Sequence, residues 1–205
     1  MKKKGFTLVE LLVYISISSI IILLAYSILS RTITTYHHQE QISSLYQDLQ
    51  AAIDFMTKEI RLAGCDPLEA GNIGFVNVYD SEDRYDTDSN SIHFTRDIDS
   101  PPDGLTNNSN ENICYYLYNS GGINKLGRKT GTTGITQPVA ENIVNLEFKY
   151  YKSDGTELAG NFNLNDIRLV EIYLTGHTSK PDPISKKRKE ITLMTAIRIR
   201  NSGFY

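Results

Sequence analysis

Glycine and proline are both missing from one long stretch of this 205-residue sequence, residues 6–63. These two residues are the usual helix breakers, because glycine is conformationally permissive and proline lacks the amide hydrogen that a helix interior needs. A single helix over the whole stretch would be about 87 Å long at 1.5 Å per residue. The missing breakers therefore predict one continuous helix that is longer than a compact domain is wide.

An excess of basic residues is missing too. The chain has 21 Lys and Arg against 24 Asp and Glu, and its formal net charge is −3. A general nucleic-acid-binding protein would present a basic face. We therefore expect no nucleic acid among the partners.

Catalytic patterns are the third absence. The sequence contains no G-x-S-x-G nucleophile motif, no P-loop and no H-E-x-x-H zinc motif. Its four histidines, His37, His38, His93 and His177, are scattered over three regions. His37 and His38 are neighbours on the predicted helix, so their side chains point about 100° apart and are poorly placed to share a metal ion. The sequence predicts a protein that is not an enzyme.

The N-terminus carries the clearest positive signal. Three lysines, residues 2–4, and Gly5 precede an apolar run over residues 6–29, which is long enough for a helix to cross a bilayer. The lysines favour a cytoplasmic N-terminus with the rest of the chain across the membrane. A secretory signal peptide would place its small-residue cleavage site after the apolar run, not before it. Glu10 lies inside the run, where an isolated charge costs roughly 2.5–3.5 kcal/mol at the helix centre.

Residues 5–10 read Gly-Phe-Thr-Leu-Val-Glu, an order that resembles the processing site of type IV prepilins and of the pseudopilins of type II secretion. The resemblance implies that a membrane prepilin peptidase cuts after Gly5, that residues 1–5 are the leader, and that the new N-terminus at Phe6 is methylated. It also implies that Glu10 is an assembly carboxylate that pairs with a Phe6 amine, because charges in a dry helical core need partners. The alternative is an uncleaved anchor with a chance glutamate.

The second half of the predicted helix, residues 30–63, is amphipathic. Polar residues, Glu59 among them, occupy the sides away from an apolar stripe. A single apolar stripe must be buried against another part of the chain. Gly64, with Pro67 shortly after it, predicts the end of the helix. The stripe recurs at steps of three and four residues: Ile42, Leu45, Leu49, Ala52, Ile53, Met56, Ile60 and Ala63.

Residues 64–205 predict a globular head that covers this stripe. Alternating apolar residues indicate strands over 144–151, 168–175 and 191–199, and shorter candidates over 74–79, 91–96 and 113–119. The pair Gly121-Gly122 and the segment 127–134 predict turns. The basic residues 186–189 fall in a predicted hairpin loop, which is either a solvated loop or a contact for an anionic partner or lipid. We predict an α+β fold in which the long N-terminal helix packs on an antiparallel β-sheet.

Residues 49–64, 138–143 and 197–201 are similar to PilW-type minor pilins and to the J pseudopilin of type II secretion. This resemblance implies a type IV pilin-like fold and a structural subunit that helps to initiate or cap pilus assembly, with roles in adhesion, motility or surface display. It implies prepilin peptidase, other minor and major pilins, the assembly platform and a tip adhesin as partners. It places the chain in the inner membrane as a single-pass protein with a periplasmic or extracellular head. The alternatives are a J-type pseudopilin, a DNA-uptake pseudopilus subunit, and a membrane-anchored enzyme or ligand-binding protein.

Two cysteines, Cys65 and Cys114, fall on the predicted outer side of the membrane, where disulfides persist. A bridge between them would close a loop of about 50 residues and contribute roughly 4 kcal/mol in the chain-entropy model. We expect this disulfide, with two unpaired buried thiols as the alternative.

An acidic segment suggests a calcium site. Calcium prefers carboxylate and carbonyl oxygens, and several carboxylates crowd this segment, although not in the EF-hand order. The alternative is a solvated loop, and no other cofactor is expected. The candidate ligands are Asp80, Asp83, Asp86 and Asp88, with Glu82 and Asn90 nearby.

Overall fold

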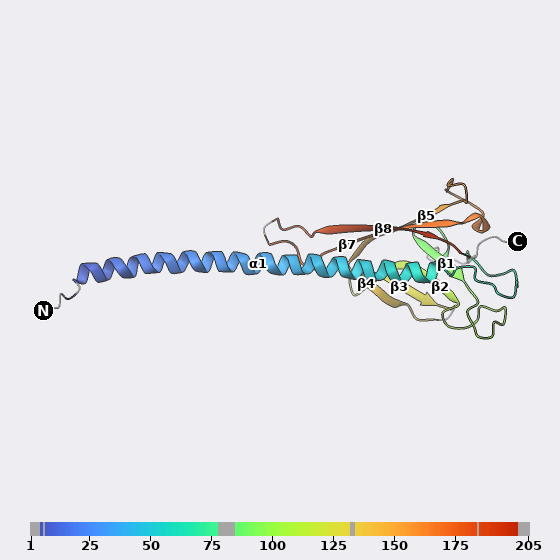
Figure 1. Cartoon of the computed structure of the whole chain (residues 1–205), viewed down its shortest axis with the longest axis horizontal. Coiled ribbons are helices and arrows are strands. Elements are labelled where there is room, and N and C mark those ends of the chain that lie inside the picture. The colour runs from blue at the N-terminus through green and yellow to red at the C-terminus, as the bar shows by residue number, and fades with distance from the viewer. Residues whose placement is uncertain (1–4, 6, 78–84, 132–133, 184, 201–205) are drawn as a thin grey trace.

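The computed structural model describes residues 5, 7–77, 85–131, 134–183 and 185–200. Its longest element is helix α1, Leu8–Ile60, which is continuous over 53 residues. Figure 1 shows the first half of α1 projecting away from the head and the second half lying within it. The predicted unbroken helix is confirmed, but it ends at Ile60, and residues 61–64 form a turn.

In the described part of the head, the strands form two four-stranded antiparallel sheets, where the sequence predicted one sheet. Sheet A has the strand order β1-β2-β3-β4 and sheet B has the order β6-β5-β7-β8. Sheet A consists of β1 (Ser91–Thr95), β2 (Asn112–Ser120), β3 (Ile123–Thr130) and β4 (Gln137–Glu141). Sheet B consists of β5 (Ile143–Tyr151), β6 (Glu157–Leu158), β7 (Leu169–His177) and β8 (Glu190–Arg198).

Sheet B contains the three strands that the sequence indicated most clearly. β7 lies between β5 and β8 and pairs with both, and a one-turn 3-10 helix (Leu164–Asp166) precedes it. The inward residues of β7 alternate strictly with less buried ones, as a half-buried strand requires. The predicted α+β architecture, a long helix packed on antiparallel strands, is confirmed.

Sheet A departs most from the prediction. The predicted 74–79 strand is reduced, over the described residues 74–77, to an isolated bridge between Phe75 and Phe94. Conversely, β3 occupies a segment read partly as a turn because of Gly127. A Cβ at Gly127 would lie 2.7 Å from Thr136 Cγ2 and 2.8 Å from Tyr118 Cδ1. Gly127 therefore permits a close approach within a strand, a second common use of glycine.

The core lies between the second half of α1 and the two sheets. Gly176 of β7 faces the helix so closely that a Cβ there would lie 3.0 Å from Leu45 Cδ1 and 3.1 Å from Leu49 Cδ2. The predicted stripe is buried from its second member onward, and Ile42 is half-buried. The buried members are Leu45, Leu49, Ala52, Ile53, Met56, Ile60 and Ala63.

Candidate functional site

The start of α1 is held by a reciprocal cap between Thr7 and Glu10. The backbone N–H and the hydroxyl of Thr7 donate to Glu10 Oε2 at 2.9 and 3.0 Å, and the backbone N–H of Glu10 donates to Thr7 Oγ1 at 3.3 Å. This is the capping box, in which the two side chains satisfy donors that a helix start leaves free. The carboxylate of Glu10 is therefore occupied within its own chain.

The predicted cleavage site lies directly before this cap. Gly5 is exposed, and apart from its chain neighbours no described residue has an atom within 4 Å of the position that its Cβ would take. Phe6 lies outside the described residues. The sequence interpretation assigned Glu10 to assembly and overlooked Thr7, although the spacing Thr-x-x-Glu before an apolar run is the capping-box pattern.

The first half of α1 exposes apolar side chains on every side. Leu8 and Leu24, for example, are 74% and 60% exposed. Two of its hydroxyls bond back to their own helix: Ser16 Oγ donates to the Leu12 carbonyl at 2.8 Å, and Ser19 Oγ donates to the Ile15 carbonyl at 2.7 Å. Among the described residues, α1 is the one helix long and apolar enough to cross a membrane. This surface suits lipid or neighbouring apolar helices.

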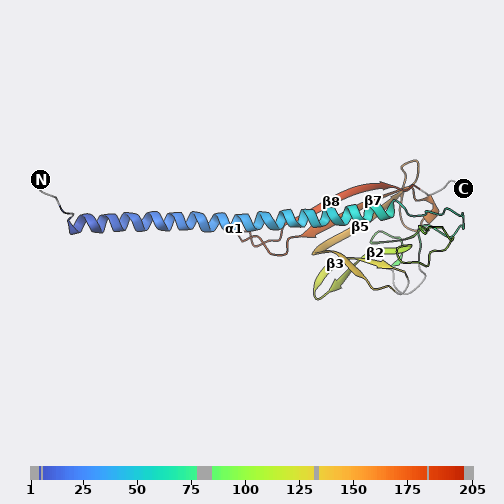
Figure 2. The same cartoon turned by 60° about the horizontal axis from the view of Figure 1, so that its bottom comes forward.

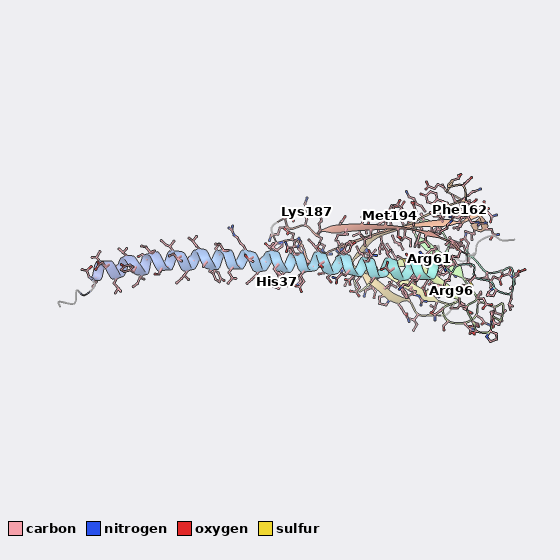
Figure 3. The ribbon with its side chains drawn as sticks, viewed as in Figure 1. His37, Arg61, Arg96, Phe162, Lys187 and Met194 are labelled. Atoms are coloured by element: carbon pink, nitrogen blue, oxygen red, sulfur yellow. The ribbon has the colours of Figure 1, made fainter. Side chains whose placement is uncertain are left out.

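At the other end of α1, Glu59 forms a buried ion cluster that the sequence did not predict. Glu59 was expected on a polar side of the helix, but only 8% of it is exposed. Arg128 of β3 donates to both of its oxygens at 2.8 Å, and Arg96 donates to Oε1 at 3.2 Å. Tyr115 Oη donates to Oε2. Arg96 and Arg128 also donate to Asn110, to its backbone oxygen and its Oδ1, at 2.8 Å. Figure 3 places Arg96 beside the end of the helix.

The cluster keeps Glu59 charged. Burial would raise the pKa of the Glu59 carboxyl, but the hydrogen bonds from Arg128 and Tyr115 and the charges of Arg128 and Arg96 outweigh it and hold the pKa below its usual value. Burial and the neighbouring carboxylate raise the pKa of Tyr115, so Tyr115 remains a donor. The cluster thus ties the helix end to sheet A.

The expected Cys65–Cys114 disulfide is not formed between these two described residues. Cys114 lies opposite His93 in the β1–β2 pair, whereas the Cys65 carbonyl accepts from the backbone N–H of Asp97 at 2.7 Å. His93 and Asp97 are separated by about 13 Å of extended chain, while bridged cysteines need Cα atoms within about 7 Å. Burial raises the pKa of the Cys114 thiol to about 12 and also raises the pKa of Cys65.

Both thiols are therefore expected to be alkylated by iodoacetamide when the protein is unfolded in guanidinium chloride without a reductant. The readout is the intact mass, compared with a matched sample that was reduced first. The two samples should have the same mass, and adding reductant to the folded protein should leave its melting temperature unchanged. If alkylation of the unfolded protein requires prior reduction, the Cys65–Cys114 disulfide expected from the sequence is present after all.

The calcium hypothesis remains a prediction. Asp80 and Asp83 lie outside the described residues. Asp88 Oδ1 accepts from the backbone N–H groups of Asn90 and Ser91 at 2.6 and 2.7 Å, so this carboxylate supports a turn. Over the described part of the chain, no group of three or more metal-ligating side chains comes together.

One comparison with known proteins agrees with the N-terminal signal. The family model described as the prokaryotic N-terminal methylation motif matches residues 1–26. A comparison with curated protein sequences found no match. Among solved structures, a type IV-like pilin from Thermus thermophilus aligns with a TM-score of 0.44 and 10% identity, covering 78% of this chain and 98% of the other. The functional interpretation therefore rests on the motif and on the geometry of α1.

Proposed function

We propose that this protein is a type IV pilin-like subunit that is made as a precursor and works by assembly. Its leader, residues 1–5, is removed by a prepilin peptidase, and the new N-terminus at Phe6 is methylated. The observation that carries the proposal is the N-terminal methylation motif over residues 1–26 at the start of a helix whose first half exposes apolar side chains on every side. The helix anchors the precursor in the inner membrane, with a cytoplasmic N-terminus and the head on the other side.

Within this class, the proposed role is that of a PilW-type minor pilin that helps to initiate or cap a pilus. The similarity of residues 49–64 and 197–201 to that group supports this role. Other minor and major pilins would pack against the apolar half of α1, and the head would present its loops to companion subunits or to an adhesin. The same residues support a J-type pseudopilin of type II secretion, and the neighbouring genes distinguish the two systems.

The cap geometry suggests how Glu10 acts during assembly. In the single chain, its carboxylate accepts from the backbone and hydroxyl of Thr7. Cleavage after Gly5 would create a positively charged amine at Phe6, next to this cap. In the filament, the Phe6 amine of a neighbouring subunit would form an ion pair with the same carboxylate. A charged hydrogen bond in a dry core is stronger than a neutral one, which would favour assembly.

Two variants of Glu10 separate capping from charge. A glutamine at this position retains an oxygen that can accept from Thr7 but carries no charge, whereas alanine removes both functions. We expect Glu10→Gln and Glu10→Ala to be cleaved normally and to enter sheared filaments, or complexes with companion pilins, at least tenfold less than the wild type. The readout is quantitative immunoblotting of the membrane and assembled fractions. If the Glu10→Gln protein enters the filaments as efficiently as the wild type, the charge of Glu10 has no role in assembly and the residue serves only as a helix cap.

A further inference from the structure

The described residues of the loop between β7 and β8, 178–183 and 185–189, fold back along α1 toward its apolar half (Figures 1 and 2). Two contacts fix it to the helix. Asp182 Oδ2 lies 3.2 Å from His38 Nε2, and the backbone N–H of Lys180 donates to Gln41 Oε1 at 3.2 Å. Both members of the His38–Asp182 pair are largely buried. The loop is thus docked beside the helix at the level of His38.

The loop has a defined shape. The backbone N–H of Asp182 donates to the Lys187 carbonyl at 2.8 Å, and that of Lys186 donates to the Asp182 carbonyl at 2.9 Å. Near its base, the backbone N–H of Thr178 donates to the Lys189 carbonyl at 2.9 Å. We call residues 178–183 and 185–189 the basic hairpin. Its turn holds Lys186 and Lys187 next to the docked Asp182.

The basic hairpin has the opposite charge to the rest of the chain. It contains five basic residues and one acidic residue, so its formal charge is 5 − 1 = +4, in a protein of net charge −3. The acidic residue, Asp182, already faces His38. Arg188 lies 3.0 Å from His177 Nε2, whereas Lys186 and Lys187 are exposed, with no ion pair to another described residue. Figure 3 shows Lys187 on the same side of the helix as Met194 of β8 but closer to the projecting half of α1.

The helix sets the distance between this charge and a membrane. Leu29 ends the apolar run, and His38 lies about 13 Å farther along the axis at 1.5 Å per residue. The headgroup layer of a bilayer extends about 5–8 Å beyond its hydrocarbon core. The remaining gap of about 5–8 Å is similar to the reach of a lysine side chain and to the Debye length of about 8 Å at physiological ionic strength. Any tilt of the helix toward the basic hairpin would shorten it.

We propose that the basic hairpin binds the anionic phospholipid headgroups beside the anchor and so holds the head in a fixed orientation at the membrane before assembly. This inference rests on the proposed membrane insertion of α1. Lysine ammonium groups near a surface of anionic lipid are attracted to its phosphates, and the attraction falls off within a Debye length. The docked position of the hairpin therefore places its free lysines where that attraction acts.

The absence of tryptophan from the sequence allows a direct test. A Pro183→Trp variant of the full chain would carry its only tryptophan in the basic hairpin. A Met194→Trp variant provides a matched control on the outer face of β8, where Met194 is 58% exposed. Each protein is reconstituted into phosphatidylcholine vesicles with or without phosphatidylglycerol. Both kinds of vesicle contain a lipid with a spin label on its headgroup. Quenching of the tryptophan fluorescence by this label is measured.

We expect phosphatidylglycerol to increase quenching at position 183 at least twofold at low salt and to leave position 194 unchanged. Raising the salt to several hundred millimolar should remove the increase. The same loss is expected from Lys186→Asn with Lys187→Gln; asparagine suits position 186, where φ is +58°. Equal quenching at position 183 in both kinds of vesicle would overturn the inference. Loss of binding to companion pilins in the double variant, with no lipid effect, would assign the lysines to a protein contact instead.

Flotation and carbonate extraction of the same vesicles separate this inference from the proposed function. Protein that resists extraction but shows no lipid-dependent quenching would refute the hairpin contact and leave the anchor intact. Protein that does not insert would refute both.

Discussion

Replacing Gly5 with leucine is expected to leave the leader attached to essentially all of the protein. The peptidase must accommodate the residue before the cut, and the proposed motif has glycine there. The described part of the fold does not itself require glycine at this position, because Gly5 is exposed and its Cβ would meet no atom of the head or of α1 within 4 Å. Lost processing would therefore report on recognition by the peptidase and not on misfolding. The measurement is the mass of the N-terminal peptide in isolated membranes.

Gly5→Ala gives a graded control for this experiment, since it adds only a methyl group. We expect part of this variant to be processed. Both variants should have the wild-type melting temperature, because the substitution lies outside the head. A mature N-terminus at Phe6 in the Gly5→Leu protein would refute the assignment of the cleavage site.

Replacing Glu59 with alanine is expected to destabilise the head by about 3–5 kcal/mol, because it leaves Arg96 and Arg128 buried without their common partner. The corresponding fall in melting temperature is about 10 °C or more for a head of this size. Thermal unfolding of the full chain in detergent, followed by circular dichroism, measures the effect. Asp54→Ala on the exposed side of the same helix is the matched control and should change stability by less than about 0.5 kcal/mol.

The same cluster predicts a pH dependence. The pKa of Glu59 is lower in the folded protein than its usual value, so its contribution to stability is complete above the unfolded pKa, about 4.3, and is lost as the pH falls through the folded pKa. The stability gap between wild type and Glu59→Ala should therefore be constant near neutral pH and should narrow below about pH 4. A gap that does not change with pH in the acid range would contradict the ionised cluster, as would a Glu59→Ala protein as stable as the wild type.

The long helix and sheet B could be predicted because their signals are local. The lack of glycine and proline over residues 6–63 favours one continuous helix, and the period of the stripe from Leu45 to Ile60 identifies its buried side. β5, β7 and β8 alternate apolar and polar residues, as strands with one buried face do. Each of these patterns depends on neighbours within a few residues.

Sheet A and the ion cluster could not be predicted because they depend on contacts between distant residues. Glycine is common in turns, so the sequence indicates a turn at Gly127. The close approach of Tyr118 and Thr136, which explains a glycine inside a strand, is visible only in the structure. Glu59 is a charged helix residue, and nothing local indicates that Arg96 and Arg128 will be brought to it from positions far along the chain. Burial of a charge depends on these partners.

The two ends of the candidate site differ in the same way. The Gly5–Glu10 pattern is local, so the sequence alone indicates the cleavage motif. The capping-box spacing of Thr7 and Glu10 is local as well. The docking of the basic hairpin on His38 depends on a contact across more than a hundred residues. The sequence indicated the charge of residues 186–189 but not their position beside the helix.

The most direct test of the proposed function is the chemical identity of the N-terminus in the protein isolated from its own membranes. Mass spectrometry of the N-terminal peptide should find Phe6 as the first residue, carrying one methyl group on its amine. An N-terminus at Met1 or Lys2, or a cut after the apolar run, would contradict the proposal that this chain is processed and assembled as a pilin-like subunit.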